Sequence, residues 1–338
     1  MASRNNVMVF IEQDEGKPAD VSLELVCKGR DLADRLRVGL SAIVLGHRIA
    51  GLADLLIAHG CDEVHLADDE RLKQYRTLPY ARVVADVIRK AQPQIVLYGA
   101  SPVGRDLAPR IASELKAGLT ADCTDLQIGD HVEPGGGKAY KDLLYQIRPA
   151  FGGNIIATII CPEARPQMAT VREGVMKMTP PNPARKGKVV PVAVALRDDD
   201  LVLEILRRER KQKSVNLKAA NIIVSGGAGV GGRDNFKLLF EFAHMIGGVV
   251  GASRSAVDSG FISKDHQVGQ TGTTVRPKLY IACGISGAVQ HRAGMQESAK
   301  ILAINTDREA PIFDIAHYGI VGDLNQVIPL LMKAYKSK

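Results

Sequence analysis

Short apolar runs alternate with amphipathic helical segments along the first two hundred residues of this 338-residue chain, and this restricts the fold more than any other feature. The strand-like runs are residues 41–45, 63–66 and 94–98, and the helical segments are residues 49–59, 80–91 and 104–115. Gly60 and Pro93 stand where the first two helices should end. Regular alternation of this kind predicts βαβ units around a parallel sheet.

The chain is long for a single hydrophobic core, so we expect two domains. Residues 198–213 combine three aspartates with a basic run, which predicts a solvent-exposed linker between the two domains. We place the boundary there. The predicted fold class is α/β, with an N-terminal parallel-sheet domain over residues 1–205 and a C-terminal doubly wound, Rossmann-like domain over residues 206–338.

Three local patterns make specific predictions. Residues 155–160 are apolar throughout and predict a central strand. Residues 311–315 predict a further short strand. Asp323 predicts the N-cap of a terminal helix over residues 324–335.

A helix is also predicted after the glycine-rich loop of residues 225–232. Apolar residues recur there with helical spacing, which predicts one buried face. The residues of this face are Phe236, Leu239, Phe240, Ala243 and Ile246.

Composition excludes several classes of protein. The net charge of +7 is spread along the chain, and aromatic residues make up only 4%, which argues against a nucleic-acid partner. Five cysteines without a CxxC pair argue against a disulfide framework, a zinc ribbon or an iron–sulfur domain. The histidines form no HxxxH pair, so we expect no metal site. The chain shows no signal peptide and no apolar run of ~20 residues, so we expect a cytoplasmic protein without a membrane span.

The glycine-rich loop offers one candidate ligand site. Residues 227–232 satisfy the pattern GxGxxG after a strand and before a helix, as in loops that bind a pyrophosphate. A dinucleotide fold also requires an acidic residue about 20 positions further on. The region around Gly251 has none, and the first acid there is Asp258, so this requirement is not met. NAD-dependent oxidoreduction, or a nucleotide-binding regulatory module, stays open as an alternative function.

Small and hydrogen-bonding residues cluster at strand ends between residues 249 and 305. Arg254 stands between two serines. Two interpretations are equally consistent with this pattern: an ordinary surface arginine, or a fixed cation beside an electron-accepting ring. A unit charge at ~4 Å interacts by about 4 kcal/mol at an effective dielectric near 20. Because a tenfold change in a one-electron equilibrium is about 59 mV, such an arginine would raise a reduction potential by roughly a hundred millivolts or more.

Taken together, these clusters resemble the alpha subunit of electron transfer flavoproteins. Residues 279–291 (Leu-Tyr-Ile-Ala-Cys-Gly-Ile-Ser-Gly-Ala-Val-Gln-His), Gly294 and residues 303–305 reproduce the family signature with its spacing. Residues 251–254, 268–272 and 311–324 match as well. The resemblance covers the whole chain and is strongest from residue 221 onward.

The resemblance implies one FAD in the C-terminal domain and assigns its contacts. The ring side is assigned to Ser253, Arg254, Val268, Gly269, Gln270 and Thr271. The pyrophosphate and the adjoining ring are assigned to Ser286, Gly287, Ala288, Val289, Gln290 and His291. The adenosine end is assigned to Asn305, Asp323 and Leu324. Arg254, Thr271 near the flavin N5, and His291 near the pyrimidine carbonyl are the residues expected to act in the redox chemistry.

The sequence departs from the family at one position, where Ala228 stands in place of an arginine and Arg233 is the candidate substitute. The resemblance also implies a heterodimer with a beta subunit that contacts the N-terminal domain, and a hinge over residues 198–215. Two versions stay open. In one, the FAD carries single electrons between an acyl-CoA dehydrogenase and a quinone reductase. In the other, NADH and ferredoxin react through the beta subunit in an electron-bifurcating system.

Overall fold

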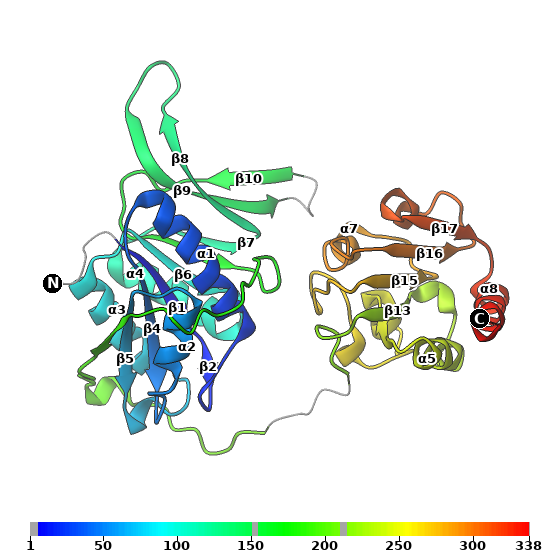
Figure 1. Ribbon diagram of the computed structural model, residues 1–338, viewed down its shortest axis with the longest axis horizontal. Helices are drawn as coiled ribbons and strands as arrows, with labels where there is room; N and C mark the ends of the chain where they lie inside the picture. The colour runs from blue at the N-terminus through cyan, green and yellow to red at the C-terminus, as the bar shows by residue number, and fades with distance from the viewer. Residues whose placement is uncertain (1–5, 151–154, 210–214, 338) are drawn as a thin grey trace. The chain divides into compact units, whose positions relative to one another are not determined.

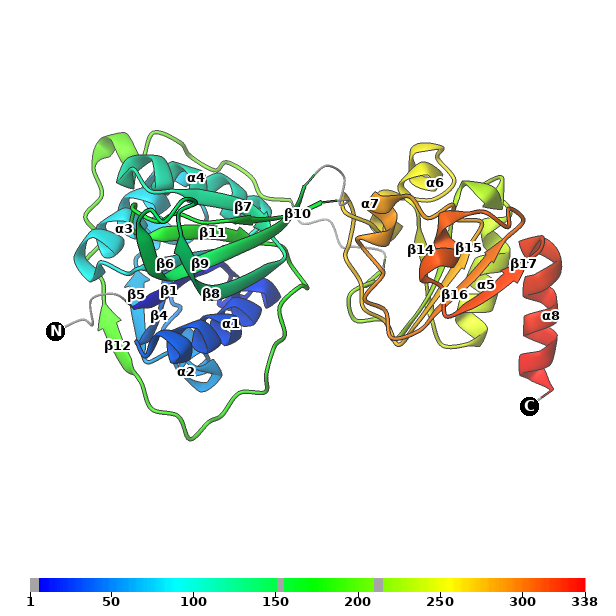
Figure 2. The same cartoon turned by 90° about the horizontal axis from the view of Figure 1, so that it is seen from above.

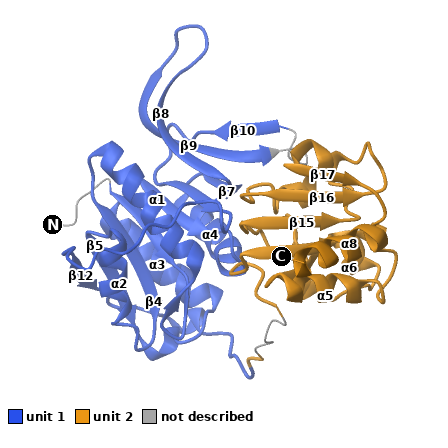
Figure 3. Ribbon diagram, turned by 45° about the vertical axis from the view of Figure 1, so that its right-hand side comes forward, with its two compact units in different colours: residues 1–150, 155–207 blue, residues 151–154, 208–338 orange. Residues whose placement is uncertain are grey.

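The computed structural model describes residues 6–150, 155–209 and 215–337. The chain divides into two compact units (Figure 3): unit 1 holds the described residues up to Arg207, and unit 2 holds those from Arg208 onward. Each unit has its own sheet and its own buried apolar clusters. The two units are therefore described separately.

Unit 1 is built on a seven-stranded parallel sheet with the order β12-β5-β4-β1-β6-β11-β7 (Figure 1). Its strands are β1 (Val7–Ile11), β4 (Leu40–Gly46), β5 (Glu63–Asp68), β6 (Ile95–Gly99), β7 (Leu119–Cys123), β11 (Gln167–Val171) and β12 (Lys188–Pro191). The short strands β2 (Gln13–Asp14) and β3 (Lys17–Pro18) form a separate pair. The alternation in the sequence thus predicted the parallel sheet correctly.

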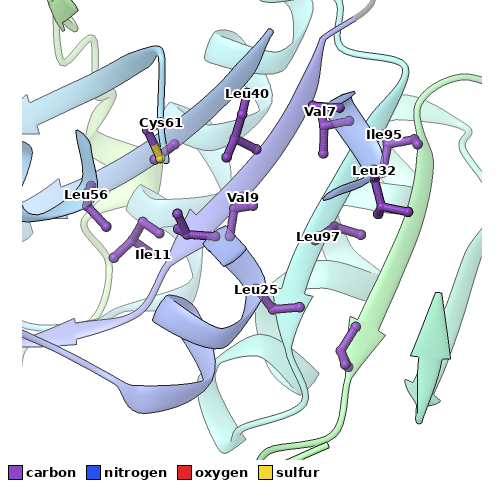
Figure 4. Packing of buried hydrophobic residues seen from close by; sticks show 14 of the residues in the cluster. Val7, Val9, Ile11, Leu25, Leu32, Leu40, Leu56, Cys61, Ile95 and Leu97 are labelled. Carbon is purple, nitrogen blue, oxygen red and sulfur yellow. The ribbon is translucent and has the colours of Figure 1, made fainter. Parts of the chain in front are cut away.

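Helices cover both faces of this sheet. The helices are α1 (Asp20–Leu36), α2 (Leu52–His59), α3 (Thr77–Ala91) and α4 (Pro102–Leu115). Figure 2 shows α1 and α2 on one face and α3 and α4 on the other. Figure 4 shows Val7, Val9 and Ile11 of the central strand β1 in the same buried cluster as Leu25 of α1. Gly60 ends α2 with a φ of 136°, as predicted.

A three-stranded antiparallel sheet, ordered β10-β9-β8, extends from unit 1 (Figure 1). Its strands are β8 (Asp125–Val132), β9 (Ala139–Ala150) and β10 (Ile155–Ile159). The prediction of a central strand over residues 155–160 was wrong, because β10 lies at the sheet edge and Ile156 is 72% exposed. An apolar run shows that a strand has apolar faces, but not what covers them.

Unit 2 contains a five-stranded parallel sheet with the order β14-β13-β15-β16-β17. Its strands are β13 (Ile222–Gly226), β14 (Val249–Ala252), β15 (Leu279–Cys283), β16 (Ile301–Asn305) and β17 (Tyr318–Val321). Counted along the unit, the order is 2-1-3-4-5, which is a doubly wound order with its switch point between β13 and β15. The predicted Rossmann-like class is therefore confirmed.

One face of this sheet is covered by the helices α5 (Phe236–Met245) and α8 (Leu324–Lys336). The prediction for α5 was wrong at one position: Phe240 is 45% exposed, whereas Phe242 is buried. These two rings lie on nearly opposite sides of a helix, so the sequence offers two apolar faces. The Phe240 ring instead packs in a T-shaped arrangement with the His266 ring, with ring centroids 5.7 Å apart.

The opposite face is covered by short helical turns and loops that contribute Leu217, Val275, Met295 and Ile312. The prediction of a strand over residues 311–315 was wrong, since these residues form a 3₁₀ turn. The turn begins at Pro311, which has no N–H to donate to a strand ladder. The Ile312 N–H donates to the Ser286 carbonyl at 3.0 Å, which holds the turn on the loop after β15. The N-cap prediction is confirmed, because the Asp323 side chain accepts from the Asn325 N–H.

Candidate functional site

A cavity of about 550 Å³ lies in unit 2, at the carboxyl ends of its strands. Its walls come from the loops that follow β13, β14, β15 and β16, together with residues 268–271. In open parallel sheets, ligands bind outside the carboxyl ends of the strands at the topological switch point. The cavity is within the size range of small-molecule sites.

Two glycines of the loop after β13 press against the loop after β15. The Gly227 N–H donates to the Cys283 carbonyl at 2.9 Å, and the Gly229 N–H donates to the Gly284 carbonyl at 3.0 Å. A Cβ at Gly227 would stand 2.1 Å from the Gly284 oxygen. These amides bond to backbone, so they are not free to hold a pyrophosphate, and NAD binding through this GxGxxG loop is disfavoured.

The short helix α6 (Arg254–Asp258) begins directly after β14 and presents a charged pair to the cavity. Ser253 is its N-cap, because the Ser253 Oγ accepts from the Ala256 N–H at 3.3 Å. The Arg254 Nε donates to the Asp258 carboxylate at 3.1 Å. Among the lining residues, all of which the structure describes, Arg254 is the one permanent cation. The contact uses Nε, so the two terminal guanidinium nitrogens lie outside it.

The loop over residues 267–273 is fixed by its backbone. The Val268 N–H donates to the Ala252 carbonyl, and the Thr273 N–H donates to the Gln267 carbonyl, both at 2.8 Å. The Gln270 N–H donates to the Gln290 carbonyl at 2.7 Å, which joins this loop to the segment after β15. Within the loop, the Gln267 Nε2 donates to the Thr271 Oγ1 at 2.9 Å.

His291 lies in the short helix α7 (Val289–Arg292) and is buried although it lines the cavity. Its Nε2 is 3.0 Å from the Tyr280 hydroxyl. Its Nδ1 has no hydrogen-bond partner among the described residues. Burial lowers the pKa of His291 to about 4, while the nearby Val268 backbone acts in the opposite direction. The imidazole is therefore neutral at pH 7.

Asn305 joins two of the lining loops. Its Nδ2 donates to the Ile285 carbonyl and its Oδ1 accepts from the Asp307 N–H, both at 3.0 Å. Asp323 lies outside the lining residues, where it caps α8. Leu324 packs in the core between α8 and the sheet. Neither Asp323 nor Leu324 therefore borders the cavity.

The cavity brings together most of the residues singled out in the sequence. Those that line it are Ser253, Arg254, Val268, Gly269, Gln270, Thr271, Ser286, Ala288, Gln290, His291 and Asn305. Four do not: Gly287, Val289, Asp323 and Leu324. Ala228 lines the cavity, whereas the exposed Arg233 is not among the lining residues.

Sequence reasoning assigned no ligand contact to several lining residues, which are Ser255, Asp258, Gly284, Ile285, Asp307 and Ala310. Asp258 carried a usable signal, because it stands four residues after Arg254 on a short helix. Asp307 and Ala310 follow a strand end, and only the parallel arrangement of β15 and β16 shows that this end faces the cavity.

The described ranges lack two further features. No group of three or more His, Cys, Asp or Glu side chains there is arranged to hold a metal ion. None of the helices in the same ranges combines the length and the apolar character needed to cross a bilayer.

Comparison with known families assigns both units. Residues 7–196 match the electron transfer flavoprotein domain, and residues 216–296 match the electron transfer flavoprotein FAD-binding domain. A protein of Thermoanaerobacterium thermosaccharolyticum named electron transfer flavoprotein subunit alpha is 49% identical over 337 residues, covering 99% of both chains. The chain belongs to the family of electron transfer flavoprotein alpha subunits.

Other members of this family are similar over their whole length. Protein FixB of Clostridium saccharobutylicum is 50% identical and covers 99% of this chain and 98% of its own. The acryloyl-CoA reductase electron transfer subunit beta of Anaerotignum propionicum is 44% identical and covers 99% and 96%. The electron transfer flavoprotein FAD-binding domain spans every cavity loop except the one after β16.

Proposed function

We propose that this chain is the alpha subunit of a heterodimeric electron transfer flavoprotein and binds one FAD in the unit 2 cavity. The carrying observation is that residues from separate strand-end loops, far apart in the sequence, line one cavity at the switch point of the sheet. The family match to an FAD-binding domain over residues 216–296 supports the same ligand. The protein would act as an electron carrier and not as a catalyst of bond chemistry.

The side chains of the cavity suit a flavin. The neutral His291 ring lines the cavity, and flavin edges offer such a ring both donors and acceptors. Arg254 supplies one positive charge beside hydroxyl and amide groups from Ser253, Gln270 and Thr271. When bound, FAD would supply the one-electron redox chemistry, and the chain would orient it and tune its electronics.

Three residues would tune the redox reaction. Arg254 would stabilise negative charge that develops on the ring, because an opposite charge within a few ångströms favours the charged form. Thr271 would donate a hydrogen bond near N5. His291, neutral at pH 7, would bond near the pyrimidine carbonyl. The segment 286–290 and Asn305 would hold the pyrophosphate and the adenosine side.

Partners follow from the family. A beta subunit would pack on unit 1, and an acyl-CoA dehydrogenase would exchange electrons with the FAD. The relative named as an acryloyl-CoA reductase electron transfer subunit supports a dehydrogenase-type partner. In the bifurcating version, NADH and ferredoxin would react through the beta subunit. Free cysteines, four of them buried, are typical of a reducing compartment such as the cytoplasm.

The first test is the flavin content of this chain purified with its beta subunit. One FAD per heterodimer supports a simple carrier, and two support the bifurcating version. A colourless protein that binds AMP or ADP tightly would overturn the proposal in favour of a nucleotide-binding module. Because Gly227 and Gly229 donate to backbone, the NAD-dependent alternative has little support.

A second test concerns the segment 198–215, of which residues 210–214 lie outside the described part. We propose that it acts as a hinge that carries the FAD between donor and acceptor. A cross-link that prevents rotation should then slow electron transfer while FAD stays bound. Unchanged turnover in the cross-linked protein would contradict the hinge.

A further inference from the structure

We propose that Gln267, a buried residue behind the cavity wall, positions the Thr271 hydroxyl so that its hydrogen points into the cavity. The inference rests on the proposed FAD site. It assigns a positioning role to a side chain that is not among the residues lining the cavity.

Gln267 is held firmly. It is 4% exposed, and its backbone bridges to Ala252 of β14. Its N–H donates to the Lys264 carbonyl at 3.0 Å, and its carbonyl accepts from the Thr273 N–H at 2.8 Å. These bonds fix the backbone, and burial leaves the side chain few alternative rotamers, so it presents its amide to Thr271 in one orientation.

The polarity of the contact decides where the Thr271 hydrogen goes. The Gln267 Nε2 carries only donors, so at 2.9 Å it makes the Thr271 Oγ1 the acceptor. A hydroxyl has one hydrogen, which is then left for another partner. Thr271 is exposed and lines the cavity, so the open direction for this hydrogen is toward the ligand.

A donor directed at the redox-active edge of a flavin favours the reduced form, because that form carries more electron density. Gln267 would thus act on the reduction potential without touching the flavin. Without the amide, the hydroxyl is free to rotate and to donate elsewhere. The bound flavin would then lose part of its preference for the reduced form.

The test is a double-mutant cycle on the heterodimer with FAD bound, using Gln267→Met and Thr271→Val. Each change keeps approximate shape and removes polarity. We expect Gln267→Met to lower the ratio of affinities for reduced and oxidised flavin by about tenfold, which is about 59 mV for one electron. In the Thr271→Val background the same change should have almost no effect, since the hydrogen that it positions is gone.

The matched control is Gln167→Met in unit 1. Gln167 is also buried, and its Oε1 accepts from the Leu144 N–H, so the same chemical change is made away from the cavity. The potential should stay unchanged in this variant. Melting temperatures of all variants report on folding.

Gln267→Glu is the second variant, for use if the methionine variant does not fold. Its carboxylate accepts the Thr271 hydrogen, so we expect a lower reduction potential. The share of this decrease that acts through the Thr271 hydroxyl should disappear in the Thr271→Val background. A shift of the same size in both backgrounds would overturn the inference. So would an equal loss of affinity for both redox forms in Gln267→Met. A wild-type heterodimer without FAD would instead overturn the proposed function.

Discussion

The His291 Nε2 lies 3.0 Å from the Tyr280 hydroxyl, and both rings are buried. When Tyr280 donates in this contact, Nδ1 is the ring atom that carries the hydrogen, and Nδ1 is the atom without a partner in the chain. The pair therefore holds a neutral imidazole in the cavity wall. This arrangement depends on Tyr280 of β15, which sequence analysis cited only within the family signature of residues 279–291.

The first prediction concerns pH. The pKa of His291 is lowered from its ordinary value near 6.5 to about 4, so between these values the unfolded chain binds a proton that the folded chain does not. Stability should therefore fall as pH falls from about 6.5 to about 4, with an His291 share on the order of 3 kcal/mol. Chemical denaturation of flavin-free wild type and His291→Gln would measure it. A difference between the two proteins that does not change over this range would contradict the prediction.

The second prediction concerns charge at the cavity. Asp258→Asn removes the carboxylate that is 3.1 Å from the Arg254 Nε, so the flavin potential should rise. Arg254→Gln should lower it. Both side chains are about two-thirds exposed, so solvent screens them and we expect shifts of at most about 59 mV for one electron. Asp234→Asn is the control, because Asp234 pairs with Lys237 outside the cavity lining. Equal shifts in Asp258→Asn and the control would rule out a local effect.

The third prediction concerns Gly287, which has a φ of +89°. A Cβ there would stand 2.3 Å from the Ile312 nitrogen, so Gly287→Ala combines backbone strain with a clash. Gly260 has a φ of +73° but no atom within 4 Å, so Gly260→Ala carries strain alone. We expect about 1–3 kcal/mol of destabilisation for Gly260→Ala and more for Gly287→Ala. Comparable urea midpoints for the two variants would show that the loop and the 3₁₀ turn separate easily.

The fourth prediction concerns the antiparallel sheet of unit 1. Ile156 is 72% exposed, so Ile156→Ser should change stability by no more than about 0.5 kcal/mol. Leu144 on β9 is fully buried, so Leu144→Ala should cost about 2–5 kcal/mol. Denaturation of the chain alone compares them. A large cost for Ile156→Ser would mean that β10 is covered in solution.

Local sequence patterns predicted the features that depend on neighbouring residues. The parallel sheets, the end of α2 at Gly60 and the cap at Asp323 follow from spacing and from single residues. The misplaced features depend on distant contacts. Nothing near residues 155–160 shows that β10 has only one neighbour, and nothing near Phe240 shows that Phe242 faces the core. The contact between Gln267 and Thr271 is local, but its meaning appears only once Thr271 is seen to line the cavity.

The contact between the loops after β13 and β15 also limits which sequences this fold tolerates. A Cβ at Gly229 would stand 2.8 Å from the Gly284 oxygen, and one at Gly284 would stand 2.8 Å from the Gly229 carbonyl carbon. The obstacle in each case is backbone, so a compensating change in a neighbouring side chain cannot relieve it. A saturation library across these loops should therefore return glycine at both positions, and altered cofactor preference would have to be selected elsewhere in the cavity wall.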